Sequence, residues 1–511
     1  MNTNHSDNRI FEFPHQNTGF DAEMAYAQKS RGGCYSCGCC LGCLGLLLLI
    51  LLGIAAICYS FVSGGATLVV SEETTIITEP LKSDGETVDF HRAIQAMFEP
   101  EVQPDANGFR DVLLGYGQEI FERWGDGNNA DWQYLEMCKE LGIDPEIQPT
   151  LFLFRLTPNN IQQWLADVGK GLDAVQVAAA KPRYFVPMVR RSERDLVVTS
   201  QPLAVYAFHE DLSKAFRLRA DIQFLSEGDI ASAWKDTLTS LRLFRLVSVN
   251  HAWMKALGGI DDESLLAPVS EIVDTLTLPQ WTPERLNQAI RDLETLPDWQ
   301  DRQTTLKILQ FYLLDLLSAT RDPSDLQHRL HGRLPIEARQ AVELLRVFAF
   351  DWNLVAKELN SEIKAYGELM ERAAGQNLDE QFDLLRLRPI GMPQRILDEE
   401  EWKTFTVDHL NRTGELPFFA PGRSKLTGAM AGYLVTWAAG EMYRLQLIED
   451  SRCQALRLAL ALERFHREQG QYPDSLAELG LQPMALDMHL QYEKRGTGYR
   501  IQNKVFQLAK E

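Results

Sequence analysis

The chain has 511 residues, and its fractions of 45% hydrophobic and 24% charged residues are close to globular averages. These values exclude a collagen-like, coiled-coil or wholly disordered chain, and the length suggests two to four domains. Asp and Glu total 71 against 51 Lys and Arg, so the net charge is −20. Because no surplus of positive charge can neutralise phosphates, we expect no nucleic-acid partner.

Residues 1–40 are polar and lack helical or strand periodicity, which indicates a disordered cytoplasmic tail. A cluster of cysteines closes this tail. Its thiols are weak candidates for metal ligands, because they fall in one short run whereas a structural zinc site joins two separated pairs. Lipidation of the thiols and packing of small, soft side chains at a membrane boundary are the alternatives. The candidate ligands are Cys34, Cys37, Cys39 and Cys40.

Residues 41–62, LGCLGLLLLILLGIAAICYSFV, carry no charge. As a helix they would be about 33 Å long, enough to cross a hydrocarbon core of about 30 Å. No small-x-small cleavage site follows, so we predict a retained signal anchor, a single-pass transmembrane helix. Lys29 and Arg31 precede it and Glu72 and Glu73 follow it, so the positive-inside rule places the N-terminus in the cytoplasm. We therefore expect the lipid bilayer of the cell (inner) membrane as a partner, with the C-terminal domain extracytoplasmic.

Residues 63–88 are predicted to be an extended linker that contains a short strand. The stretch TLVVSEETTIIT, residues 67–78, is rich in β-branched side chains, which favour strands. Pro80 ends this stretch, and Ser83 to Gly85 is typical of a turn.

Residues 89–450 are predicted to form a mainly α-helical extracytoplasmic domain of packed antiparallel helix pairs. Several helix starts are marked by a capping residue, in two cases followed by proline. Residues 306–317 are almost continuously apolar, but a short segment with two charges suits a buried core helix better than a second membrane span. The predicted helix starts are Asp89, Thr157 with Pro158, Asp229, and Thr282 with Pro283.

Residues 451–511 are predicted to form a helix, a turn and a small β-hairpin. Apolar periodicity continues to Gly470, and Ser475-x-x-Glu478 is a capping box for a short helix. Gly496 to Gly498 separates two short strand-like runs, as in a hairpin.

The catalytic motifs H-E-x-x-H, G-x-S-x-G, G-x4-G-K-[ST] and G-x-G-x-x-G are absent from the sequence. His328 and His331 have a spacing that suits two ligands of one metal ion, but Arg329 and Arg333 beside them oppose a cation. We therefore expect no cofactor and name no catalytic residue.

Cys138 and Cys453 are the two cysteines beyond the apolar segment and its flank. An exported compartment permits a disulfide between them. Because nothing in the sequence places them in contact, we expect two buried free thiols.

Three stretches of the chain are distinctive as patterns. They are SEETTIITEPLKSDGETVDFHRAIQ, VQPDANGFRDVLLGYG and ALRLALALERFHREQGQYPDSLAELG. In these stretches the chain resembles an uncharacterised family of planctomycete single-pass membrane proteins. The last stretch, with its Y-P-x-S-L-x-E-L sequence, is also similar to a C-terminal segment of pseudopilin-like modules, in which a helix, a turn-helix and a β-hairpin follow one another. The resemblance implies one membrane helix and a large outer domain, and it implies no activity, substrate or catalytic residue.

The sequence therefore predicts a membrane-anchored protein of the cell envelope, a scaffold or protein-binding module without catalytic activity, with an envelope protein as its partner. An envelope hydrolase with paired carboxylates is one alternative, because folding can bring together two of the 71 acidic residues. A component associated with a secretion apparatus is the other, and it rests on residues 472–501 alone. A pocket with two converging carboxylates would favour the hydrolase.

Overall fold

All the residues that the computed structural model describes belong to one of the two units into which the chain divides, Ser60–Glu511. The predicted tail, the cysteine cluster and the apolar segment 41–62 lie outside the described residues. No helix within the described residues is both long and apolar enough to cross a membrane. The described residues are 68–98, 104–124, 130–147, 161–197, 200, 203–224, 228–256, 269–299, 301–319, 351–374, 376, 378–385, 420–480, 490–503 and 507–510.

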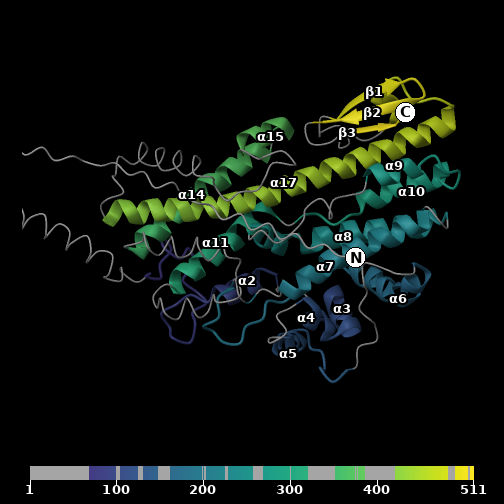
Figure 1. Ribbon diagram of the computed structural model, residues 1–511. Coiled ribbons are helices and arrows are strands. Elements are labelled where there is room, and N and C mark those ends of the chain that lie inside the picture. Colours follow the sequence, from purple (N-terminus) through teal and green to yellow (C-terminus); the bar gives the residue numbers. More distant parts are fainter. Residues whose placement is uncertain are drawn as a thin grey trace, which may run out of the picture. The chain divides into compact units, whose positions relative to one another are not determined.

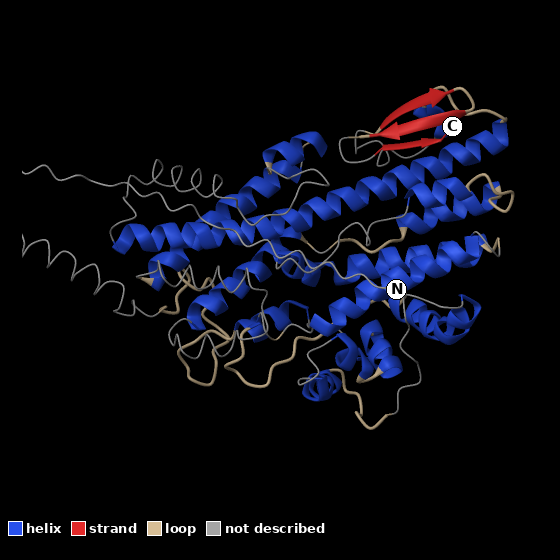
Figure 2. Cartoon of the chain, in the orientation of Figure 1, coloured by secondary structure: helices blue, strands red, loops and turns tan. Residues whose placement is uncertain are grey.

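The described part of the chain is mainly α-helical and carries one small antiparallel sheet near its C-terminus (Figure 1, Figure 2). This confirms the predicted class of secondary structure. The helices of the first half are α2 (Phe90–Phe98), α3 (Gly108–Tyr116), α4 (Glu119–Trp124), α5 (Ala130–Glu140), α6 (Ile161–Ala179), α7 (Leu203–Ile222) and α8 (Ile230–Ala256). Those of the second half are α9 (Val269–Thr275), α10 (Pro283–Glu294), α11 (Arg302–Ala319), α14 (Trp352–Ala374), α15 (Leu378–Leu384) and α17 (Ala420–Gln469). The 3-10 helices η1 (Pro104–Ala106) and η5 (Leu476–Leu479) and the strands β1 (Gln491–Arg495), β2 (Gly498–Gln502) and β3 (Gln507–Lys510) complete the set.

Three helix starts follow the predicted capping residues. Helix α2 begins after Asp89, whose carboxylate accepts a hydrogen bond from the backbone N–H of Arg92 at 3.1 Å. Helix α10 begins after Thr282, whose hydroxyl accepts a hydrogen bond from the backbone N–H of Arg285 at 3.3 Å. Helix α8 begins after Asp229, whose carboxylate accepts from the backbone N–H of Ser232 at 3.2 Å. These bonds satisfy N–H groups that have no partner inside the helix. Residues 306–317 lie within α11 and are buried except for one lysine, which confirms the predicted core helix.

Four pairs of contacting helices run antiparallel, as the sequence predicts. The short connection between α7 and α8 fixes one pair, in which Arg219 near the end of α7 contacts Asp236 near the start of α8. The other pairs are α3 with α6, α11 with α14, and α10 with α17. Two contacts set the direction of each pair. For α3 and α6 they are Gly108–Ala178 and Tyr116–Gly171; for α11 and α14, Gln303–Gly367 and Gln310–Asn360; and for α10 and α17, Asn287–Arg464 and Glu294–Arg457.

Helices α14 and α17 run parallel, in contrast to the predicted antiparallel pattern. Gly428 lies against the backbone of Val355, and Gly432, one turn further along α17, lies against Glu362, two turns further along α14. A Cβ atom on Gly428 would overlap the carbonyl oxygen of Val355, and one on Gly432 would lie 2.7 Å from the Cβ atom of Glu362. Only glycine permits this approach of the two backbones.

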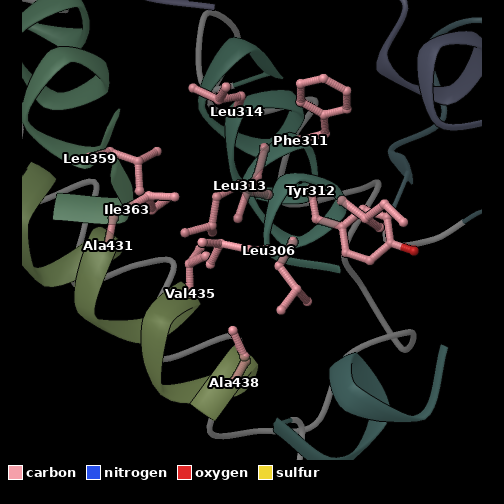
Figure 3. Packing of buried hydrophobic residues seen from close by; sticks show 14 of the residues in the cluster. Leu306, Phe311, Tyr312, Leu313, Leu314, Leu359, Ile363, Ala431, Val435 and Ala438 are labelled. Carbon is pink, nitrogen blue, oxygen red and sulfur yellow. The ribbon is translucent and has the colours of Figure 1, made fainter. Parts of the chain in front are cut away.

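Three clusters of buried hydrophobic side chains hold the helices together. The first packs α11 and α14 against the first half of α17, and Figure 3 shows Leu313, Ile363 and Val435 from these three helices directed toward one another. The second cluster packs α3 to α7. The third joins α9, α10 and the sheet to the last part of α17. Helix α17 therefore contributes to two of the three clusters.

The predicted strand within residues 63–88 is wrong over its described part. Residues 71–76 form turns and bends, and Ile76 has a φ of +66°, in the left-handed region that a strand excludes. The hydroxyl of Thr75 donates to the carbonyl oxygen of Ser71 at 2.9 Å. Local hydrogen bonds of this kind compete with strand pairing, so β-branched composition alone misleads here.

Residues 68–89, which we call the N-terminal strap, are bonded to the helical body by buried charges. Lys82 pairs with Asp315 of α11 at 3.3 Å, and the side chain of Asp315 is 2% exposed. Arg190 donates two hydrogen bonds to the carboxylate of Asp89, at 2.7 and 2.8 Å. Such a forked pair fixes both distance and orientation. The strap is therefore part of the folded body rather than a free linker.

The C-terminal segment forms a three-stranded sheet, one strand more than the predicted hairpin. Strands β1 and β2 meet at the turn that Gly496 and Gly498 predict, and β3 pairs with the other edge of β2. Glu463 of α17 holds this segment, because it accepts from the hydroxyl of Tyr472 at 3.1 Å and from the ammonium of Lys510 at 2.5 Å.

The predicted boundary between residues 450 and 451 falls inside α17, which runs through it without a break. The predicted capping box is present at η5, where Glu478 accepts from the backbone N–H of Ser475 at 2.8 Å. The C-terminal segment thus begins as a continuation of the longest helix.

Replacing Gly428 by alanine is expected to lower the free energy of unfolding by about 1–3 kcal/mol, because the added methyl group overlaps backbone in a packed contact. Gly169→Ala in α6 is the matched control. A Cβ atom at Gly169 meets no atom within 4 Å, so this change is expected to raise stability by about 0.4–1 kcal/mol. Denaturant unfolding of the full chain in non-ionic detergent measures both, and equal effects would contradict the packing described for α14 and α17.

Replacing Lys82 by methionine is expected to cost about 3–5 kcal/mol, because it leaves the Asp315 carboxylate buried without its counter-charge. Lys357→Met is the control. Lys357 also joins the strap to the body, through Glu73, but the two side chains are 48% and 74% exposed, and such pairs contribute about 0–1 kcal/mol. The same unfolding assay measures both variants. If Lys82→Met lowers the free energy of unfolding by as little as Lys357→Met does, the buried pairing of Lys82 with Asp315 is contradicted.

Candidate functional site

A groove of about 410 Å³ opens where the start of α11 and the end of α14 lie beside α17. Pockets of this size are at the lower end of those that take small ligands. Its lining combines three carboxylates, a guanidinium, two amides and three less polar side chains. The lining residues are Trp299, Asp301, Arg302, Gln303, Met370, Glu371, Ala374, Gln446 and Asp450.

The two walls of the groove are held together by Gln303. Its side-chain N–H group donates to the carbonyl oxygen of Gly367 at 3.3 Å and to the carboxylate of Glu371 at 3.1 Å, both on α14. Asp301 caps α11, because its carboxylate accepts from the backbone N–H of Thr304 at 2.8 Å. These bonds fix the rim residues on the ends of two helices.

Asp450 lies on the α17 side of the groove and is held by one of its two oxygens. Oδ1 accepts from Nη2 of Arg245 at 3.0 Å and from Nε1 of Trp299 at 2.9 Å. Among the described residues, Oδ2 has no hydrogen-bond partner. The Asp450 side chain is 30% exposed. The carboxylate is therefore fixed in orientation and presents one free acceptor.

Burial raises the pKa of Asp450 above its ordinary value, and this effect exceeds the opposing attraction of Arg245 and the hydrogen bond from Trp299. The carboxylate of Asp450 is thus less easily ionised than an exposed one, and a cation beside it would offset the cost of burial.

Gln446 lies one turn before Asp450 on α17 and lines the same groove. The residue is only 4% exposed. No other described residue donates to or accepts from its side-chain amide. An amide without a protein partner at the wall of a groove can bond to a ligand or to water.

Arg302 supplies the positive charge of the lining. Its guanidinium lies over the ring of Tyr443, 3.8 Å from the centroid. With Asp301, Glu371 and Asp450 ionised, the lining carries an excess of two negative charges. The described residues contain no group of three His, Cys, Asp or Glu side chains placed to hold a metal ion. The arrangement therefore suits an organic cation better than a divalent metal.

Two other buried polar clusters in the described residues have a structural role. Arg219 donates to both oxygens of Asp236 at 2.6 Å and to Asp173 at 2.8 Å, and Gln176 also donates to Asp236. Burial lowers the pKa of His209 to about 4, so this imidazole is neutral inside its cluster. The Arg219 cluster thus joins α6, α7 and α8.

The residues singled out from the sequence do not meet in this groove. Cys138 and Cys453 are both buried and free, in different hydrophobic clusters, which confirms the prediction of two free thiols. Burial raises the pKa of both thiols. The remaining candidates lie outside the described residues, and so does the predicted helix start at Thr157 and Pro158. These candidates are Cys34, Cys37, Cys39, Cys40, His328 and His331.

Sequence reasoning missed the groove residues because no motif connects them. Trp299 and Asp450 are 151 positions apart, and only the packing of three helices brings them together. A weak local signal existed in the polar run at Asp301 to Gln303, directly before an apolar helix, but that pattern is also typical of an ordinary helix start.

Comparisons with protein-family models, with curated proteins and with solved structures found no match to this chain. The resemblance to planctomycete single-pass membrane proteins and to pseudopilin-like modules therefore stays a prediction, and function has to be argued from the groove itself.

Replacing Asp450 by asparagine is expected to change how stability depends on pH. Because the folded-state pKa is raised, the wild-type chain loses the Asp450 contribution as pH rises from about 4 through that raised pKa. The difference in unfolding free energy, wild type minus Asp450→Asn, should therefore fall over this range.

Asp229→Asn provides a control of opposite sign. Hydrogen bonds from Ser232 lower the pKa of Asp229, so wild type minus this variant should instead rise with pH, and only below about pH 4.5. Denaturant unfolding at several pH values measures both differences. A difference for Asp450→Asn that is constant or rises with pH would contradict the burial of this carboxylate.

Proposed function

We propose that the chain is a membrane-anchored protein of the cell envelope whose helical body binds a partner protein at the α17 groove, without catalysis. The observation that carries the proposal is a pair of groove groups without a partner among the described residues, the Gln446 amide and Oδ2 of Asp450. Both are held in place by the fold and both remain available for bonds to another molecule.

The chemistry of the groove favours binding over reaction. Its lining contains no histidine, cysteine, serine or lysine that would serve as a nucleophile or a base near neutral pH. Two of its charged groups are held in orientation by the fold, because Arg302 stacks on Tyr443 and Oδ1 of Asp450 accepts from Arg245 and Trp299. Such a preorganised, polar lining suits recognition.

The N-terminal strap supports the role of a tethered body. Asn360 of α14 donates to the carbonyl oxygens of Glu73 and Thr74, at 2.8 and 3.1 Å. The backbone N–H of Val69 donates to Asn353 at 2.8 Å. With residues 41–62 as the membrane anchor, a load on the bound partner would pass through these bonds to the anchor.

Photo-crosslinking in intact cells tests the binding function. A photoreactive residue at Ala374, the exposed groove residue that ends α14, is expected to give one reproducible crosslinked envelope protein. The control position is Ala174, an exposed alanine on α6 away from the groove, where that product should be absent. The same product from both positions, or none from Ala374, would contradict binding at the groove.

A hydrolase that uses paired carboxylates is the second candidate. The specific observation in its favour is the raised pKa of Asp450 beside a groove that also holds Asp301 and Glu371. Turnover of an envelope glycan or peptide by the purified full chain, abolished by Asp450→Asn, would establish this function in place of the binding function.

A further inference from the structure

The chemistry of the groove identifies the part of a partner that it would recognise. This step rests on the proposed binding function and concerns the kind of side chain that enters the groove. The wall supplies two acceptors on one face of α17, four residues apart, so that they lie one above the other. One is Oδ2 of Asp450, and the Gln446 amide supplies the other through its oxygen, because an amide without a protein partner can turn either end toward a ligand.

The orientation of Asp450 is set from behind. Arg245 and Trp299 both donate to Oδ1, so the carboxylate cannot turn to satisfy Oδ2 within the body without breaking two bonds. A ligand that donates to Oδ2 therefore meets an acceptor whose position is already fixed. This preorganisation reduces the entropy lost on binding.

The remaining lining fits a flat cation on an apolar stem. Met370, Ala374 and the edge of Trp299 provide less polar surface beside the acceptors. The carboxylate of Glu371 lies at the rim. The excess of two negative charges repels anionic groups and attracts cationic ones.

An arginine side chain matches these features better than a lysine. Its guanidinium offers five N–H donors in a plane, which can reach two neighbouring acceptors at once, and it is more weakly hydrated than an ammonium. Its three methylene groups suit the apolar part of the groove. The excess of negative charge in the lining disfavours a phosphate or another anion as the ligand.

We propose that the groove binds the guanidinium group of an arginine side chain on the partner protein, with Oδ2 of Asp450 and the amide oxygen of Gln446 as its acceptors and Glu371 as a rim contact.

Three short peptides test this proposal: acetyl-Gly-Gly-Arg-Gly-Gly-amide, its lysine analogue and its citrulline analogue. Citrulline has nearly the shape of arginine but carries no charge. Titration calorimetry with the full chain in non-ionic detergent, at pH 7 and low salt, should show weak binding of the arginine peptide. The lysine peptide should bind more weakly than the arginine peptide. The affinity of the citrulline peptide should be lower than that of the arginine peptide by about tenfold or more.

Substitutions in the groove locate the binding. Glu371→Gln lies at the exposed rim and should weaken the arginine peptide about two- to fivefold, while Gln446→Leu and Asp450→Asn should each weaken it about tenfold or more. Asp229→Asn, at the start of α8 outside the groove lining, should leave it unchanged. Asp450→Asn also weakens the contacts of Asp450 with Arg245 and Trp299. If the Asp450→Asn protein is unstable, the result for Glu371→Gln decides whether the peptide binds in the groove.

Equal binding of the arginine and citrulline peptides, no binding of any peptide, or an arginine affinity unaffected by Glu371→Gln and Gln446→Leu would overturn the proposal. These results are separable from a failure of the binding function. If the Ala374 crosslink persists in Gln446→Leu and no arginine preference exists, the partner binds by other contacts. If the peptide binds as expected and no crosslink forms, the arginine-binding site is supported and the binding of a partner protein at the groove is contradicted.

Discussion

The close approach of α14 and α17 at Gly428 and Gly432 is the contact on which the rest of the described structure depends. Without side chains at these positions, two helices pack backbone to backbone and in parallel. This fixes which end of α14 lies beside which part of α17. Helix α14 therefore ends at Ala374, next to Gln446 and Asp450, and the groove opens at that end.

Helix α17 carries many polar side chains into buried surroundings, and several of them are paired. Glu441 and Arg444 pair with each other at 2.8 Å along the helix, and Glu463 accepts from the turn and from β3. Burying an unpaired polar group costs stability. The Gln446 amide and one oxygen of Asp450 depart from this pattern at the groove, unmatched among the described residues, as Gln454 Oε1 does elsewhere on the helix. A departure at the wall of a groove is best explained by a ligand.

The local features of this fold were readable from the sequence and the long-range ones were not. Thr282 and Asp229 start helices because their side chains satisfy the first N–H groups, and Gly496 turns a hairpin, all of which act over three or four residues. The strand predicted around Thr75 failed because hydroxyl bonding to nearby backbone prevailed over β-branched propensity. The groove could not be predicted because its acceptors come together only through the parallel packing of α14 and α17. Two isolated glycines in the sequence do not predict that packing.

Hydrogen–deuterium exchange of the full chain, with and without the arginine peptide at saturating concentration, tests the central claim most directly. The account predicts slower exchange on binding in three segments that meet at the groove, residues 299–303, 370–374 and 446–450, and unchanged exchange in α3 to α6. Protection confined to other segments, or none at saturation, would contradict a binding site built on α17.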